Sequence, residues 1–181
     1  ILYWSSFKPL NPRPQLSTFL YLTFGLFLFG LGETLLIASS QGVSPWTVFA
    51  QGISFNSNFS IGLSTFFVSI GVLILWVPLK QKPGMGTLMN AIIISIVLDY
   101  SYFYMPKPDQ FHYQIIQCFI GVFFVGLGSG FYLIANLGPG PRDGLMTGLQ
   151  KLTKLPIFFV RTFIEIFVVI IGWYLGGAVG F

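Results

Sequence analysis

Charge is the scarcest property of this 181-residue sequence, because Asp, Glu, Lys and Arg together make up only 8% of it. A typical soluble domain carries about 25%. So few charges cannot build a water-facing surface when 54% of the residues are hydrophobic and the mean hydropathy is +0.80. The composition excludes an ordinary soluble domain and predicts a protein whose main partner is the lipid bilayer.

Cysteine and histidine are almost missing as well. The single cysteine, Cys118, cannot form an internal disulfide, and the single histidine, His112, has no second histidine or cysteine pair beside it. The sequence thus lacks the usual ligand sets for zinc. It also lacks a phosphate-binding loop, a dinucleotide fingerprint and a nucleophile elbow. We therefore expect no metal, no cofactor and no enzymatic activity.

Long apolar runs, by contrast, are abundant. A helix needs about 20 mainly apolar residues to cross a hydrocarbon core that is ~30 Å thick. Five segments meet this requirement, at residues 16–38, 59–79, 87–105, 113–135 and 157–175. The sequence predicts an all-α membrane protein, a polytopic helical bundle.

The basic residues are distributed unevenly around these spans. If the spans alternate in direction, Lys107 lies on one side of the membrane and the other eight basic residues lie on or near the opposite side. These eight are Lys8, Arg13, Lys80, Lys82, Arg142, Lys151, Lys154 and Arg161. The positive-inside rule then places the amino terminus in the cytoplasm. This pattern accounts for the net charge of +4, and we expect no nucleic-acid partner.

An internal repeat relates the two halves of the chain. A shift of 96 residues pairs Gly30-Leu31-Gly32 with Gly126-Leu127-Gly128 without a gap. The same shift pairs Gly25 with Gly121, Gly42 with Gly138, Pro45 with Pro141, and Gly52 with Gly148. Because the shift carries three spans, the halves must enter the membrane from opposite sides. We predict an inverted 3+3 repeat, with residues 1–105 as the first half, residues 106–181 as the second, and a sixth span missing from this chain.

Each half has a Gly- and Pro-rich stretch between its first two spans, "SQGVSPWTVF" in the first and "LGPGPRDGLM" in the second. Proline suits the first position of a helix, and Ser44 and Gly140 stand in the N-cap positions. We predict short re-entrant helices near residues 45–54 and 141–151, which interrupt the bundle and point their amino termini toward its interior. The motif residues are Gly42, Ser44, Pro45, Gly138, Gly140 and Pro141. The alternative is a pair of ordinary loops.

Most of the five acidic residues lie at membrane depth, where a charge costs about 2.5–3.5 kcal/mol on insertion scales. Glu33 follows Gly30-Leu31-Gly32, and Asp99 lies well inside the third span. Glu33 is a candidate for coupling to a proton or cation, or for contact with a substrate amine, and Asp99 is a candidate for a second coupling group close to Glu33. The alternatives are a protonated or hydrogen-bonded carboxyl at Glu33 and an interfacial residue at Asp99.

Two arginine–acid pairs complete the set of candidates. Arg142 and Asp143 open the second short helix, whose amino terminus attracts anions, and Arg142 adds a bidentate donor for a carboxylate or phosphate. Asp143 could instead cap the helix and pair with Arg142 in a simple cytoplasmic loop. Arg161 and Glu165 are one helical turn apart, which favours an ion pair. Their partners under the repeat, Thr65 and Ser69, are polar too, as expected for a lined cavity.

The segments "GLGETLLIASSQGVSPWTVFAQGIS" and "GLGSGFYLIANLGPGPRDGLMTGL" resemble the signatures of the YczE-type integral membrane proteins, which are related to the YitT group. The resemblance covers essentially the whole chain, and "GPGPRDGLM" is its most specific part. It implies a bacterial, multi-pass protein of the cytoplasmic membrane, but no particular biochemical activity. The missing sixth span is the one departure from the family pattern.

Two functions remain open on these observations. The inverted repeat, the interrupted helices and the buried charges are typical of secondary transporters, and favour transport or export of a small anionic or zwitterionic solute. Small size and few polar groups fit equally well a non-transporting partner that assembles another membrane complex. The sequence leaves open whether the chain forms a homodimer or joins a larger membrane complex.

Overall fold

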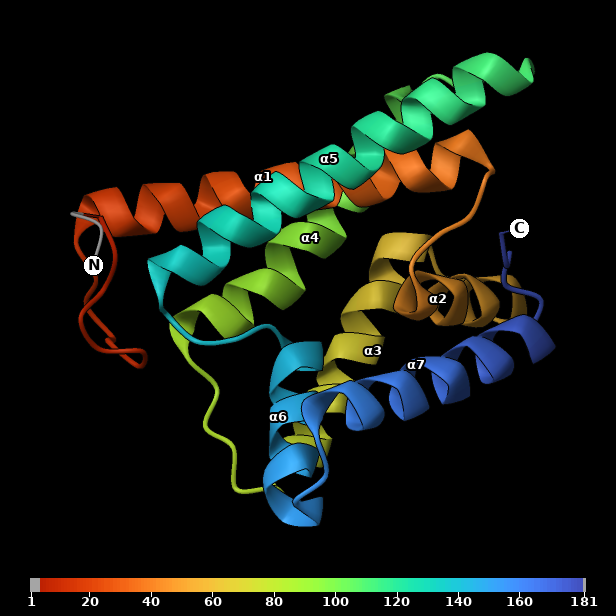
Figure 1. Ribbon diagram of the computed structural model, residues 1–181. Helices are drawn as coiled ribbons and strands as arrows, with labels where there is room; N and C mark the ends of the chain where they lie inside the picture. The colour runs from red at the N-terminus through yellow and green to blue at the C-terminus, as the bar shows by residue number, and fades with distance from the viewer. Residues whose placement is uncertain (1–3, 181) are drawn as a thin grey trace.

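The computed structural model describes residues 4–180 and shows seven helices over that range (Figure 1). They are α1 (Leu16–Ser39), α2 (Pro45–Asn56), α3 (Ile61–Trp76), α4 (Met85–Tyr104), α5 (Phe111–Ala135), α6 (Pro141–Thr153) and α7 (Ile157–Tyr174). Four of them, α1, α4, α5 and α7, are each long and apolar enough to cross a membrane. Helices α2 and α3 are bent by 115° at a short break and together would make a fifth span. The predicted all-α membrane fold is confirmed.

The helices pack as two groups, which Figure 1 shows on either side of the molecule. In the first helix group, α1 packs on α5 and on α4; in the second, α2, α3, α6 and α7 pack on one another. Contacts between the groups come mainly from α4 against α3, with a smaller contribution from α6. Each group therefore contains helices from both halves of the sequence.

Each helix group has its own apolar core. The core of the first group is built from Leu22, Leu26, Ile94, Tyr132, Ala135 and Leu137. The core of the second is built from Trp46, Val68, Val72, Trp76, Leu145 and Val168. Many large apolar side chains point outward instead, such as Phe119 on α5 and Phe163 on α7, as expected for helices whose solvent is lipid.

Helices α1 and α5 cross in opposite directions at two close glycine contacts (Figure 1). A Cβ added to Gly25 would lie 2.9 Å from the carbonyl oxygen of Gly128, and one added to Gly32 would lie 2.7 Å from that of Gly121. Small residues let the backbones of membrane helices approach this closely. Glycine at these four positions is therefore a packing requirement.

These contacts exchange under the 96-residue shift, since Gly25 corresponds to Gly121 and Gly32 to Gly128. Two further contacts exchange in the same way. Trp76 packs on Gly144 and Gly172 packs on Val48, while Gly84 packs on Gly138 and Gly180 packs on Gly42. Such exchange is the mark of a two-fold relation between identical surfaces. The halves of the chain thus use the same surfaces against each other.

The connections that lead into α2 and α6 have matching backbones. Each long helix before them ends on a left-handed residue, Ser40 (φ 56°) or Asn136 (φ 55°). Two residues later, Gly42 (φ 137°) and Gly138 (φ 110°) adopt backbones that favour glycine. Proline then occupies the first turn of each short helix, as it does at many helix starts.

Candidate functional site

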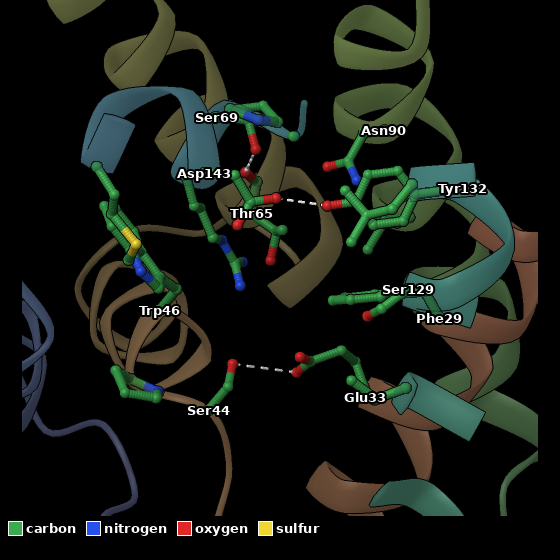
Figure 2. A pocket seen from close by; sticks show the side chains of 18 of the residues that line it. Phe29, Glu33, Ser44, Trp46, Thr65, Ser69, Asn90, Ser129, Tyr132 and Asp143 are labelled. Carbon is green, nitrogen blue, oxygen red and sulfur yellow. Dashed lines mark hydrogen bonds between the residues drawn. The ribbon is translucent and has the colours of Figure 1, made fainter. Parts of the chain in front are cut away.

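A cavity of about 360 Å³ lies between the two helix groups, and we call it the central cavity. In Figure 2, Glu33, Phe29, Ser129, Tyr132 and Asn90 face Ser44, Trp46, Thr65, Ser69 and Asp143 across it. The first set belongs to α1, α4 and α5; the second belongs to α2, α3, α6 and the N-cap of α2. The volume lies near the small end of the range for ligand pockets, about 300–1,000 Å³.

Most of the lining of the central cavity comes in pairs related by the 96-residue shift. The seven pairs are Phe29 with Val125, Glu33 with Ser129, Ser44 with Gly140, Pro45 with Pro141, Trp46 with Arg142, Thr65 with Arg161, and Ser69 with Glu165. The other lining residues are Asn90, Ile94, Tyr132, Leu133, Asp143 and Met146. The cavity therefore lies where equivalent surfaces of the two halves meet.

Glu33 reaches from α1 to the amino terminus of α2. Its side chain is buried, and its Oε2 accepts a hydrogen bond of 2.7 Å from Thr47 Oγ1 and one of 3.4 Å from Ser44 Oγ. Ser44 is the N-cap of α2, yet its hydroxyl makes no capping bond and lies 2.8 Å from Thr47 Oγ1. The positive end of the α2 dipole favours a carboxylate here. The two helix groups are thus bridged by a polar contact on this side of the cavity.

Asp143 forms the matching bridge on the other side. It is the third residue of α6, as Thr47 is of α2, and its Oδ2 accepts a hydrogen bond from the Tyr132 hydroxyl on α5. In the first bridge the carboxyl group, Glu33, lies on the long helix α1, whereas in the second bridge the carboxyl group, Asp143, lies on the short helix α6. Both bridges lie across the central cavity, away from the main contact between the groups, which is that of α3 with α4.

Arg142 lines the cavity between these two bridges. Its guanidinium lies 5.5 Å from the centre of the Trp46 ring, within the range of a cation–π interaction. Burial lowers the pKa of Arg142, and the negative charges of Glu33 and Asp143 raise it. An arginine keeps its proton in proteins, so the cavity contains a permanent cation.

Arg161 and Glu165 lie on one face of α7 and form the expected contact, with 2.8 Å between Arg161 Nε and Glu165 Oε1. Both line the central cavity, together with their repeat partners Thr65 and Ser69 on α3. The hydroxyls of Thr65 and Ser69 each donate to a carbonyl oxygen of their own helix. Ion pairing makes both charged side chains of α7 tolerable at membrane depth.

Replacing Arg161 by alanine should lower the yield and thermal stability of the purified protein, because Glu165 would lose its ion-pair partner near the lipid. The double variant Arg161→Ala/Glu165→Gln should recover part of the loss, since a neutral amide needs no counter-charge. Size-exclusion profiles and melting temperatures in detergent would measure both effects. A double variant as unstable as Arg161→Ala alone would contradict the role of the pair.

Asp99 is not brought to the central cavity. Its Oδ1 accepts a hydrogen bond of 2.7 Å from the backbone amide of Gly62, and its Oδ2 accepts one of 2.6 Å from the Ser60 hydroxyl. Both partners lie at the amino terminus of α3, which leaves backbone amides in need of acceptors. In the structure, the Asp99 carboxyl therefore joins α4 to the start of α3.

The remaining motif residues shape the connections beside the cavity. Ser44, Pro45, Gly140 and Pro141 line it, whereas Gly42 and Gly138 do not. Gly138 instead packs on Gly84 at the start of α4, where the Thr87 hydroxyl donates 2.7 Å to the carbonyl oxygen of Pro139. These contacts hold the start of α6 against the first helix group.

Three of the lining residues that a sequence-based search for charged groups misses carry a polar ring or a side-chain amide. They are Trp46, Tyr132 and Asn90. A signal existed for two of them: the 96-residue shift pairs Trp46 with Arg142, and Asn90 is an amide inside a predicted span. Tyr132 carries no comparable signal, because its role depends on contact with Asp143 from another helix. Within residues 4–180, no group of three His, Cys, Asp or Glu side chains could hold a metal ion.

The comparisons with known proteins agree on a membrane family. The sequence profile of a family described as "Family of unknown function (DUF6198)" matches residues 16–180. An "Uncharacterized protein" of Haemophilus influenzae is 42% identical over 166 residues, covering 92% of this chain and 76% of that relative. The "Uncharacterized membrane protein YczE" of Bacillus subtilis is 31% identical over 161 residues, covering 87% and 74%. The "Uncharacterized protein YyaS" of the same organism is 27% identical over 166 residues, covering 90% and 83%. No solved structure matches the chain.

Proposed function

The chain belongs to the DUF6198 family of YczE-like membrane proteins, and we propose that it is a secondary transporter or exporter of a small anionic or zwitterionic solute rather than an enzyme. The observation that carries the proposal is the central cavity, which lies between two helix groups and contains Arg142, an arginine with no ion pair or hydrogen bond among the described residues. A multi-pass membrane protein with a charged, ligand-sized cavity needs a polar ligand to fill it. We propose transport because secondary transporters hold their solutes in sites of this kind.

The 96-residue internal repeat of the sequence, which we predict to be inverted, supports the same proposal. Secondary transporters commonly bind their solutes where two inverted repeats meet, close to half-helices whose amino termini face the solute. Here α1 and α5 run in opposite directions, and the amino termini of α2 and α6 both line the central cavity. We infer a pseudo-two-fold axis in the membrane plane that passes through this cavity.

The contact between the helix groups is concentrated on α3 and α4, and this uneven contact supports movement between two states. Two polar bridges, Glu33 to Thr47 and Tyr132 to Asp143, cross the cavity. Hydrogen bonds of this kind contribute only about 0.5–1.5 kcal/mol net, so they can open and close during a cycle. We propose that the groups rock against each other in the cytoplasmic membrane of a bacterium, with the amino terminus in the cytoplasm, as the basic residues indicate.

Cysteine accessibility can test this proposal without knowledge of the solute. Ser129 lines the cavity and would be replaced by cysteine in a Cys118→Ser background. A membrane-impermeant thiol reagent would be added to intact cells and, separately, to inverted membrane vesicles. An alternating-access transporter should react from both sides, because the cavity opens to each in turn.

Two exposed positions provide matched controls. Asp109→Cys between α4 and α5 should react only in intact cells, and Thr153→Cys at the end of α6 only in inverted vesicles. If both controls react as expected while Ser129→Cys reacts from one side or neither, the cavity does not alternate. That result would favour the second function, a partner that assembles another membrane complex.

A further inference from the structure

The guanidinium of Arg142 has no hydrogen-bond acceptor within the described part of the chain. Across residues 4–180, its side chain makes no ion pair within 4.0 Å and no hydrogen bond. It lies over the Trp46 ring, and the negative charges of Glu33 and Asp143 act on it from a longer distance. A guanidinium carries five donors in a planar fork. A partly buried cation of this kind calls for an acceptor, and the central cavity lies directly in front of it. The missing acceptor is therefore expected to come from a ligand.

In each of the two carboxylates that line the cavity with Arg142, one oxygen accepts hydrogen bonds from the protein and the other does not. Glu33 uses Oε2 for the hydroxyls of Thr47 and Ser44, and Asp143 uses Oδ2 for that of Tyr132. Among the described residues, Glu33 Oε1 and Asp143 Oδ1 accept no hydrogen bond. Both residues line the cavity. Two carboxylate oxygens thus remain available to a donor from a ligand, one on either side of it.

The charges that line the cavity indicate which of three ligand classes (anions, cations or zwitterions) fits it best. Arg161 and Glu165 neutralise each other, which leaves one cation, Arg142, and two anions, Glu33 and Asp143. An anionic ligand would meet Arg142 but would be repelled by both carboxylates. A cationic ligand would meet the carboxylates but would be repelled by Arg142. A ligand that carries both charges meets all three groups.

We propose, on the basis of the transport function above, that the central cavity recognises a small zwitterion with a carboxylate and a protonated amine, the chemistry of a free amino acid. The carboxylate binds the Arg142 guanidinium as a bidentate acceptor, and the ammonium donates to Glu33 and Asp143. Apolar side chains of Phe29, Ile94 and Met146 contact the carbon skeleton between them. The cavity of about 360 Å³ has room for a solute of this size.

A thermal-shift panel of matched analogues tests the zwitterion. The purified protein would be melted in neutral detergent with each proteinogenic amino acid, with β-alanine and with phosphoethanolamine. Each zwitterion that stabilises the protein would then be compared with its deaminated acid and with its decarboxylated amine. We expect one group of zwitterions to raise the melting temperature, and both single-charge analogues to bind at least tenfold more weakly.

Variants on each side of the cavity give a second readout. Glu33→Gln and Asp143→Asn should weaken the zwitterion more than the deaminated acid, because they remove only the partners of the amine. Arg13→Ala, at an exposed arginine before α1, should change neither. Equal affinity for the zwitterion and its deaminated acid, or equal weakening of both by Glu33→Gln, would overturn the proposal. If phosphoethanolamine alone stabilised the protein, the proposal that the ligand carries a carboxylate would be wrong, and the cavity would instead recognise a lipid-type headgroup.

The experiments distinguish failure of the zwitterion proposal from failure of the transport proposal. A zwitterion that binds as described but does not cross the bilayer of loaded proteoliposomes would contradict transport and leave the recognition chemistry standing. A deaminated acid that binds and is transported as well as the zwitterion would contradict the recognition chemistry and leave transport standing.

Discussion

Replacement of Arg142 by alanine should weaken binding of the best zwitterion from the panel by about 10- to 150-fold. A hydrogen bond to a charged group is worth about 1.5–3 kcal/mol, which converts to this range of dissociation constants. The effect on the fold should be smaller than the effect on binding, because the Arg142 side chain makes no ion pair within residues 4–180 and interacts with the charges of Glu33 and Asp143 only from a longer distance. Isothermal titration calorimetry and melting curves on the same preparation would separate the two effects.

Arg142→Lys is the conservative comparison. It keeps the positive charge but replaces a planar fork by a single ammonium, so it should recover only part of the affinity. Arg161→Ala provides the contrast, since its main effect is expected on stability through Glu165. An Arg142→Ala protein that folds normally and binds the zwitterion with unchanged affinity would exclude Arg142 as a ligand of the solute.

Replacement of Gly128 by alanine should separate α1 from α5 and lower the stability of the whole protein. The new Cβ would lie 2.5 Å from the carbonyl oxygen of Gly25 and 2.5 Å from the backbone nitrogen of Phe29. Both are backbone atoms, which cannot move aside without moving the helix. Overpacking of this kind typically costs about 1–3 kcal/mol. Unfolding in a denaturing detergent would measure the loss.

Gly126→Ala is the matched control on the same helix. An added Cβ at Gly126 would meet no atom within 4 Å, so the variant should be as stable as the wild-type protein or slightly more stable, given the higher helix propensity of alanine. Equal stability of the Gly126 and Gly128 variants would show that the close crossing of α1 and α5 contributes nothing to the fold.

The long apolar runs predict the spanning helices well because hydropathy and length are local properties. The segment predicted at 16–38 is α1 (Leu16–Ser39), and the segment predicted at 113–135 lies within α5 (Phe111–Ala135). The third helix is shorter than predicted, at Ile61–Trp76, because Lys80 and Pro78 follow it and the chain turns there. Membership of the YczE-like family, predicted from two glycine-rich segments, is confirmed.

The short helices are predictable for a different reason. Pro45 and Pro141 lie at the first turn of α2 and α6, as their fixed backbone angle favours. The grouping of the seven helices is not predictable in the same way. It depends on which glycine faces which, and the glycines at Gly126 and Gly128 look alike in sequence although only Gly128 is packed.

The candidate residues of the site show the same limit. One rule, that ionisable groups at membrane depth are expensive, singles out Glu33, Arg161, Glu165 and Asp99. The first three line the central cavity, whereas Asp99 binds the start of α3. The rule gives the energetic cost of a charged side chain in the membrane, but not which partner the side chain contacts. The partner of Asp99 is a backbone amide 37 residues earlier in the chain, which no local pattern reveals.

The contact between Arg142 and Trp46 also has an optical consequence. An indole emits according to the charges near its ring, and Arg142 lies 5.5 Å from the centre of this one. A solute that draws the guanidinium toward itself changes the field at the ring. The other tryptophans, Trp4, Trp76 and Trp173, do not line the cavity. We therefore expect the emission of Trp46, isolated by replacing the other three tryptophans with phenylalanine, to change when the solute binds.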